Sequence, residues 1–169
     1  NLQVARYETS ESSIPSMIRK LSKLCSPKRL VELGRCIRCT TQWPVVAGVY
    51  AGVRSLPGSF VFRSGKGSQL RIDDRDELTT VWHVFFSGEY SVPANACSIL
   101  DLGANIGAFA VWAAENFPQA RIWSVEPFPS TFDRLKDNLG RNNFGDRVSC
   151  EQLAVCGKDG VVKFDATVG

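Results

Sequence analysis

The chain has 169 residues, of which 44% are hydrophobic and 22% are charged, and its formal net charge is +3. These values are ordinary for one globular domain with a hydrophobic core, and so small a charge does not favour a nucleic-acid partner. The most apolar N-terminal stretch, residues 43–53, is too short to span a bilayer, and residues 1–13 lack the apolar region of a signal peptide. We therefore expect a cytoplasmic protein without a transmembrane segment.

The first 57 residues are predicted to form a basic helical extension. Apolar side chains recur at helical spacing in residues 14–25, Pro27 is expected to end that helix, and a second short helix is expected at residues 30–37. The first 42 residues hold eight Lys and Arg side chains against three Glu. A basic amphipathic helix can make weak contact with a membrane surface, but docking on its own domain is the more common role.

Residues 58–97 are predicted to form a β-hairpin and a helix. Residues 60–63 and 69–72 read as two strands around a glycine-rich turn. Asp73 or Asp74 is suited to cap the following helix, which Gly88 ends. The only histidine, His83, lies beside the apolar stripe of this helix, where a structural role is more common than catalysis.

The six cysteines do not form a recognisable metal or redox motif. Cys36 and Cys39 have C-x-x-C spacing, but no second such pair follows and the flanking residues look helical. A structural zinc site uses four ligands, and a thioredoxin-like pair follows a strand. We therefore expect reduced thiols and no bound metal.

Residues 98–169 are predicted to form an incomplete Rossmann-like core. Strands are expected at residues 99–102, 121–126 and 148–155, with helices at residues 106–117 and after Ser130, and an edge strand at residues 161–164. Strands that alternate with helices imply a parallel sheet and an α/β fold.

The turn after the first of these strands is the candidate ligand site. It reads Asp101-Leu102-Gly103-Ala104-Asn105-Ile106-Gly107, and two glycines let a ligand approach the backbone in front of a helix N-terminus. A dinucleotide fingerprint would have glycine where Asn105 stands, and Asp101 would repel a pyrophosphate. The same acid suits S-adenosyl-L-methionine, which carries an ammonium and a sulfonium group.

The second strand adds an acid at its end. Glu126 is placed to accept hydrogen bonds from ribose hydroxyls, which occur in both NAD and S-adenosyl-L-methionine. Pro127 stiffens the loop that follows, and Phe128 either lies against adenine or packs on the next helix. A purely structural turn explains two glycines and two acids less well than cofactor binding does.

The strings I-L-D-L-G-A-N-I-G at residues 99–107 and V-E-P-F-P at residues 125–129 resemble the FkbM-type methyltransferases. A G-E-Y segment ahead of the first strand, which contains Glu89 and Tyr90, and an asparagine after the next helix are also similar to this family. The resemblance covers roughly residues 58–165. It implies a class I methyltransferase fold and methyl transfer from S-adenosyl-L-methionine to a hydroxyl of a sugar, glycan or other small molecule.

The resemblance also implies roles for individual residues. Glu89 and Tyr90 would lie near the methionine end of the cofactor, and Glu126 would hold its ribose. Asp101, Gly103, Asn105 and Gly107 would contact the methionine portion, and Ala104 belongs to the same turn. His83, Glu89 and Asp101 are the candidates for a catalytic base.

The family continues with a K-x-D-x-E-G segment and further strands, which do not occur in this chain. The sequence is therefore expected to be the N-terminal part of an enzyme. Two alternatives stay open: a nicotinamide-dependent oxidoreductase, and a non-catalytic remnant of a cofactor-binding domain.

Overall fold

The computed structural model describes residues 26–58, 60–157 and 160. Its strands are β1 (Phe60–Arg63), β2 (Gln69–Ile72), β3 (Ser98–Leu102), β4 (Arg121–Val125) and β5 (Val148–Glu151). Its helices are α2 (Pro27–Cys39), α3 (Trp43–Tyr50), α4 (Arg75–Trp82), the π-helix η2 (His83–Ser87), α5 (Ala108–Asn116), α6 (Pro129–Gly140) and the short 3-10 helix η3 (Gly145–Arg147).

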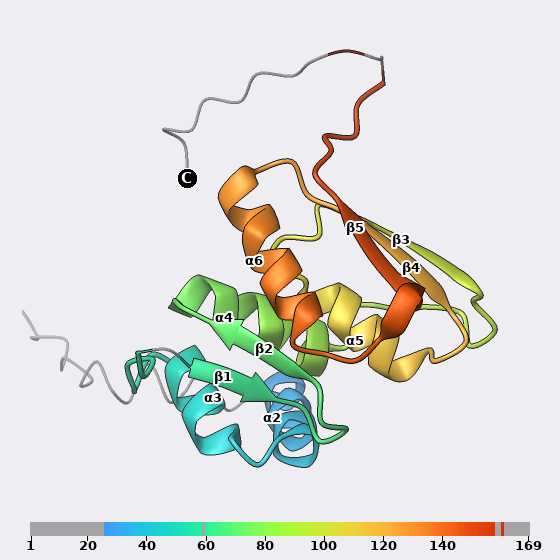
Figure 1. The fold of residues 1–169 in the computed structure, drawn as a ribbon. Coiled ribbons are helices and arrows are strands. Elements are labelled where there is room, and N and C mark those ends of the chain that lie inside the picture. The colour runs from blue at the N-terminus through green and yellow to red at the C-terminus, as the bar shows by residue number, and fades with distance from the viewer. Residues whose placement is uncertain (1–25, 59, 158–159, 161–169) are drawn as a thin grey trace, which may run out of the picture.

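The α/β fold class is confirmed. Strands β3, β4 and β5 form a parallel sheet in that order, and β1 and β2 form an antiparallel hairpin. Helices α4, α5 and α6 lie on one side of the parallel sheet, and α2 and α3 lie near the hairpin, away from that sheet (Figure 1). Leu100, Leu102 and Trp123 on β3 and β4 are 54%, 55% and 42% exposed within the described part of the chain.

The N-terminal helices differ from the prediction. Pro27, expected to end an earlier helix, is the first residue of α2, because the Ser26 side chain accepts a hydrogen bond from the Arg29 N–H at 3.3 Å and proline needs no partner there. Helix α3 was not predicted, since its sequence is apolar all round and has no helical periodicity. The helix expected at residues 14–25 lies outside the described residues, as does the strand expected at residues 161–164.

Several boundaries in the parallel sheet and its helices also differ from the predicted ones. Strand β5 ends at Glu151, so residues 152–155 are not part of it. Helix α5 begins at Ala108 because Gly107 is left-handed, with φ 87°. Ser130 does not cap α6, which begins at Pro129 with Phe128 in the cap position. The loop after β4 therefore turns directly into α6.

The hairpin formed as predicted, and the helix expected to end at Gly88 is α4 followed by the π-helix η2. Phe62 pairs with Leu70 across the hairpin, and the Asp74 side chain caps α4 by accepting a hydrogen bond from the Glu77 N–H at 2.8 Å. The buried side chains of the hairpin, α3, α4 and η2 belong to the same core cluster as Ile106 and Val111. The glycine turn therefore rests on the same core as the N-terminal helices.

Asn138 of α6 and Asn142, which follows the end of that helix, bind the free edge of β2. Asn138 accepts a hydrogen bond from the Arg71 N–H at 2.7 Å and donates to the Arg71 carbonyl at 3.3 Å. Asn142 makes the same pair of bonds with Gln69, both at 2.8 Å. Asn138 also donates to the carbonyl of Ile106 at 2.9 Å. The two side chains thus make the hydrogen bonds that a neighbouring strand would make to β2, and Asn138 also ties the hairpin to the glycine turn.

We expect Asn138→Ala to lower the free energy of unfolding by about 2 kcal/mol, because the buried carbonyl of Ile106 and the partly buried backbone groups of Arg71 lose their partner. Denaturant unfolding measures this effect. The exposed Asn143 is the matched control, and its replacement by alanine should change stability by less than about 0.5 kcal/mol. Equal effects from both variants would contradict the structural role of Asn138.

Candidate functional site

The turn between β3 and α5 has a left-handed backbone at three positions. The φ angles are 74° at Gly103, 51° at Asn105 and 87° at Gly107. The N–H groups of Gly103 and Ala104 both donate to the carbonyl of Val125, at 3.0 and 2.9 Å. The turn is therefore held against the end of β4, at the carboxyl edge of the sheet.

The two glycines have different surroundings. A Cβ at Gly103 would meet no atom within 4 Å, whereas a Cβ at Gly107 would lie 2.7 Å from Cδ1 of Leu135 on α6. The sequence pattern predicts that both glycines give a ligand access to the backbone. In the structure only Gly103 borders open space, while Gly107 allows α6 to pack closely on the turn.

Asp101 lies at the base of this turn and is only 8% exposed. The Ser124 hydroxyl on β4 donates to its carboxylate at 3.3 Å. Burial raises the pKa of Asp101 to about 6; the Ser124 hydrogen bond opposes this rise and the nearby charge of Glu126 adds to it. The site therefore disfavours a second anion and favours a cation beside Asp101.

The raised pKa of Asp101 predicts a pH-dependent stability. The folded value of about 6 is above the ordinary value of 3.8, so the proton on Asp101 stabilises the fold below about pH 4, and this contribution is lost as the pH rises through 6. The loss is on the order of 3 kcal/mol. We expect Asp101→Asn, which cannot ionise, to be more stable than the native chain at pH 8 by about 1–2 kcal/mol.

Unfolding titrations at pH 4, 6 and 8 measure this difference. Replacement of the exposed Asp146 by asparagine is the control, and it should leave the pH dependence unchanged. A native chain and an Asp101→Asn variant with parallel pH profiles would contradict the assigned pKa.

Glu126 follows β4 and joins the two loops of the site. Its Oε2 accepts a hydrogen bond from the Asn105 N–H at 2.9 Å, and its Oε1 accepts one from the Phe128 N–H at 3.1 Å. The side chain is buried, and the residue is 5% exposed. Because a carboxylate offers about four lone-pair positions, these two bonds leave it able to accept others.

The loop after Glu126 borders the same site. Phe128 is 41% exposed and stands in the cap position of α6. The Pro127 carbonyl accepts a hydrogen bond from the Gln152 side chain at 3.3 Å, which connects this loop to the residues after β5. The structure thus brings Pro127 and Phe128 together with Asp101, Glu126 and residues 103–107.

Tyr90 and Glu89 of the G-E-Y segment contact different parts of the molecule. The Tyr90 ring lies 5.0 Å from the ring of Phe109, in the first turn of α5 just after the glycine turn. Glu89 instead faces α2 and η2: its carboxylate is 3.4 Å from Lys28 Nζ and 3.3 Å from His83 Nδ1. Only Tyr90 is tied by these contacts to the element that carries the turn.

Ser124, Leu135 and Asn138 were missed by sequence reasoning. Each supports the turn or Asp101 through a contact between elements. Leu135 was expected on the buried face of its helix, but neither its contact with Gly107 nor the buried asparagine could be read from local spacing. A serine between the apolar residues Trp123 and Val125 was the one available signal, since a buried hydroxyl needs a partner.

The cysteines of the described residues are free thiols. Cys36 and Cys39 lie one turn apart on α2, as their helical flanks predicted. Burial raises the pKa of Cys36 to about 12, with the nearby Cys39 adding to the shift, and burial also raises the pKa of Cys39. Thiols of this kind are poor nucleophiles at neutral pH, which argues against a redox role for the pair.

Within residues 26–58, 60–157 and 160, none of the helices is both long enough and apolar enough to cross a bilayer.

No protein-family model matches the chain. A methyltransferase of Sordaria araneosa, sdnD, is 39% identical over 67 residues, which are 40% of this chain and 24% of that protein. Methyltransferase 1 of Beauveria bassiana is 37% identical over 59 residues, which are 35% of this chain and 22% of that protein. The chain is thus similar to curated methyltransferases, and it spans about a quarter of their length.

Among solved structures, the methyltransferase FkbM of Methylobacillus flagellatus covers 82% of this chain and 33% of its own length at 13% identity, with a TM-score of 0.36. A putative transferase of Pyrococcus horikoshii covers 83% of this chain and 64% of its own length at 19% identity, with a TM-score of 0.43.

Proposed function

We propose that this chain is the cofactor-binding part of an S-adenosyl-L-methionine-dependent methyltransferase. The observation that carries the proposal is a buried carboxylate, Asp101, directly below a glycine turn that is open to solvent at Gly103. A cationic ligand above this turn would offset the charge that makes ionised Asp101 unfavourable. The local similarity to curated methyltransferases supports the same assignment.

The geometry fits this cofactor better than a dinucleotide. Asp101 and Glu126 put two carboxylates at the turn, where the two negative charges of a pyrophosphate would be repelled. Asn105 has a left-handed backbone and a side chain at the position that a dinucleotide fingerprint gives to glycine. The carboxylate of Asp101 suits the ammonium group of S-adenosyl-L-methionine.

The residues of the site have separable tasks in this proposal. Asp101 accepts a hydrogen bond from the ammonium group, the free lone pairs of Glu126 bind the ribose hydroxyls, and Phe128 lies against the adenine. The cofactor, when bound, supplies a methyl group on a sulfonium, which needs no further activation by the protein. The protein therefore contributes mainly alignment and the exclusion of water.

The acceptor is proposed to be a hydroxyl of a sugar, glycan or other natural product, following the resemblance to FkbM-type enzymes. Attack of the oxygen on the methyl carbon forms the C–O bond as the C–S bond breaks, and the hydroxyl proton passes to a base. Of the candidates for that base, Asp101 is committed to the ligand, and Glu89 pairs with His83 at 3.3 Å and faces α2 and η2, so none of the three is assigned as the base.

Calorimetric titration of the chain with S-adenosylhomocysteine and, separately, with NAD tests the proposal. Circular dichroism first establishes that the sample is folded. Binding of S-adenosylhomocysteine alone is the expected result. Binding of NAD alone would favour an oxidoreductase, and the absence of binding by a folded chain would favour a non-catalytic remnant.

A further inference from the structure

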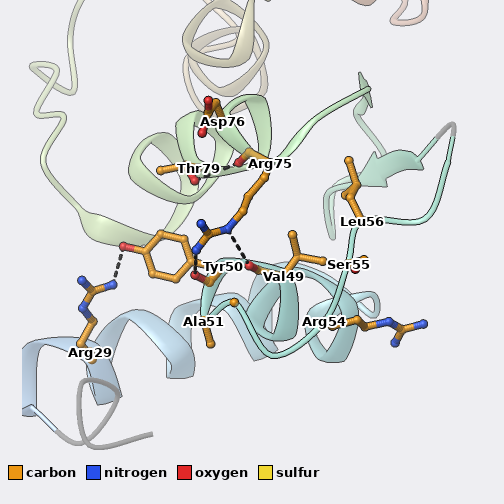
Figure 2. Close-up of a pocket in the computed structure, with 11 residues that line it drawn as sticks. Arg29, Val49, Tyr50, Ala51, Arg54, Ser55, Leu56, Arg75, Asp76 and Thr79 are labelled. Carbon is orange, nitrogen blue, oxygen red and sulfur yellow. Dashed lines mark hydrogen bonds between the residues drawn. The ribbon is translucent and has the colours of Figure 1, made fainter. Parts of the chain in front are cut away.

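A cavity lies on the N-terminal side of the molecule, between the end of α3, the loop that follows it and the first half of α4. Its volume is about 870 Å³, which is within the range of small-molecule sites. Figure 2 shows the side chains around it. The polar ones are Arg29, Tyr50, Arg54, Ser55, Arg75 and Thr79, with a single acid, Asp76.

Arg75 is held in place at one side of this cavity. Its Nε and Nη2 donate to the carbonyls of Val49 and Tyr50 at 3.2 and 3.1 Å, so the side chain crosses from α4 to the end of α3 (Figure 2). A Cβ at Gly52 would lie 3.4 Å from Nη2 of Arg75, so the glycine keeps the space beside this guanidinium open. None of the ion pairs in the described residues involves Arg75.

Arg54 and Arg29 add positive charge to the same cavity. The Arg54 side chain is exposed and has no hydrogen bond or ion pair to the described residues. Arg29 donates to the Tyr50 hydroxyl and lies 3.9 Å from the buried Glu32, so its charge is largely balanced. The positive charges of Arg54 and Arg75 at this cavity therefore exceed the single negative charge of Asp76.

We propose that this cavity binds a phosphate-bearing small molecule, with Arg54 and Arg75 as its charged contacts. A guanidinium pairs with phosphate through two parallel N–H bonds, and it does so better than with neutral groups. Arg75 is pre-positioned by the α3 carbonyls, while Arg54, whose side chain has no partner among the described residues, closes on the ligand. The hydroxyls of Ser55 and Tyr50 provide further contacts for phosphate or ligand oxygens.

The site adjoins the glycine turn without belonging to it. Asp76 also lines a smaller cavity of about 400 Å³, whose other walls include Asn105 of the turn and the start of α6. The two cavities thus share a wall on α4. The phosphate site is tested by binding alone, so its outcome is independent of whether the chain binds S-adenosylhomocysteine.

Calorimetric titration of the whole chain with inorganic pyrophosphate at about 0.15 M salt tests the proposal, because exposed charge pairs are screened under these conditions. We expect saturable binding that Arg54→Gln weakens at least tenfold. Arg121→Gln is the matched control, since Arg121 is an exposed arginine at the start of β4 without a side-chain partner in the described residues. The Arg121→Gln variant should bind pyrophosphate with the affinity of the native chain.

Arg54→Gln is preferred to Arg75→Gln, which removes two contacts to α3 as well as the charge. Absence of pyrophosphate binding by the native chain, or an equal loss of affinity in the Arg54→Gln and Arg121→Gln variants, overturns the proposal.

Vesicles of phosphatidylcholine with phosphatidic acid provide a second test of the same cavity. Binding to these vesicles without binding of pyrophosphate also overturns it, and would assign the arginines to a lipid surface.

Discussion

Replacement of Glu126 by alanine is expected to weaken S-adenosylhomocysteine binding by about 1–3 kcal/mol, or roughly 5- to 150-fold. Glu126 has two tasks at the site. Its carboxylate accepts hydrogen bonds from the N–H groups of Asn105 and Phe128, and these bonds set the distance between the glycine turn and the loop after β4. Its remaining lone pairs are those we assign to the ribose. The variant loses both contributions, and calorimetry measures the combined effect.

Glu151→Ala is the matched control for this experiment. Glu151 ends the adjacent strand β5, its side chain is exposed, and only its backbone carbonyl contacts Glu126, at 3.2 Å. We expect its affinity for S-adenosylhomocysteine to stay within about twofold of the native value, since exposed substitutions seldom exceed 0.5 kcal/mol. Unchanged affinity in Glu126→Ala would remove the ribose assignment, because a loosened turn and a lost acceptor should each weaken binding.

Gly107→Ala is expected to lower the free energy of unfolding by about 3 kcal/mol. A left-handed backbone costs a residue with a Cβ about 1–2 kcal/mol, and φ at this position is 87°. The new methyl group would also stand 2.7 Å from Cδ1 of the fully buried Leu135, and overpacking of this kind costs about 1–3 kcal/mol. Denaturant unfolding provides the measurement.

Gly103→Ala separates these two costs. Its φ is 74°, but no atom lies within 4 Å of the added Cβ, so we expect a loss of only about 1–2 kcal/mol in stability. The same methyl group would enter the space proposed for the cofactor, and S-adenosylhomocysteine affinity should fall at least tenfold. If both alanine variants lose the same stability, contact with Leu135 does not explain Gly107.

The elements with regular spacing were predicted well from sequence. The hairpin, α4 and the alternation of strand and helix from β3 to β5 follow from apolar periodicity and from turn residues, which are local properties. Helix α3 was missed because it is apolar on every side, and the start of α6 was misplaced because Pro129 rather than Ser130 begins it. Both errors concern segments whose state depends on neighbouring elements rather than on their own pattern.

The composition of the site was also visible in the sequence, but the roles within it were not. Two glycines, Asp101 at a strand end and Glu126 at the next strand end can be placed together because parallel strands share a carboxyl edge. The sequence did not predict that Glu89 faces Lys28 and His83, because this placement depends on how a helix more than 50 residues earlier packs against η2. No local pattern carries that information.

By itself, the sequence determined the fold class, the glycine turn and the two acids that flank it, because each is set by residue type and short-range spacing. Only the tertiary structure decided that Gly107 serves packing while Gly103 faces open space, that Asn138 and Asn142 bind the edge of β2, and that burial raises the pKa of Asp101. These properties arise where segments distant in the chain meet, and they depend on distances and burial that exist only in the folded protein.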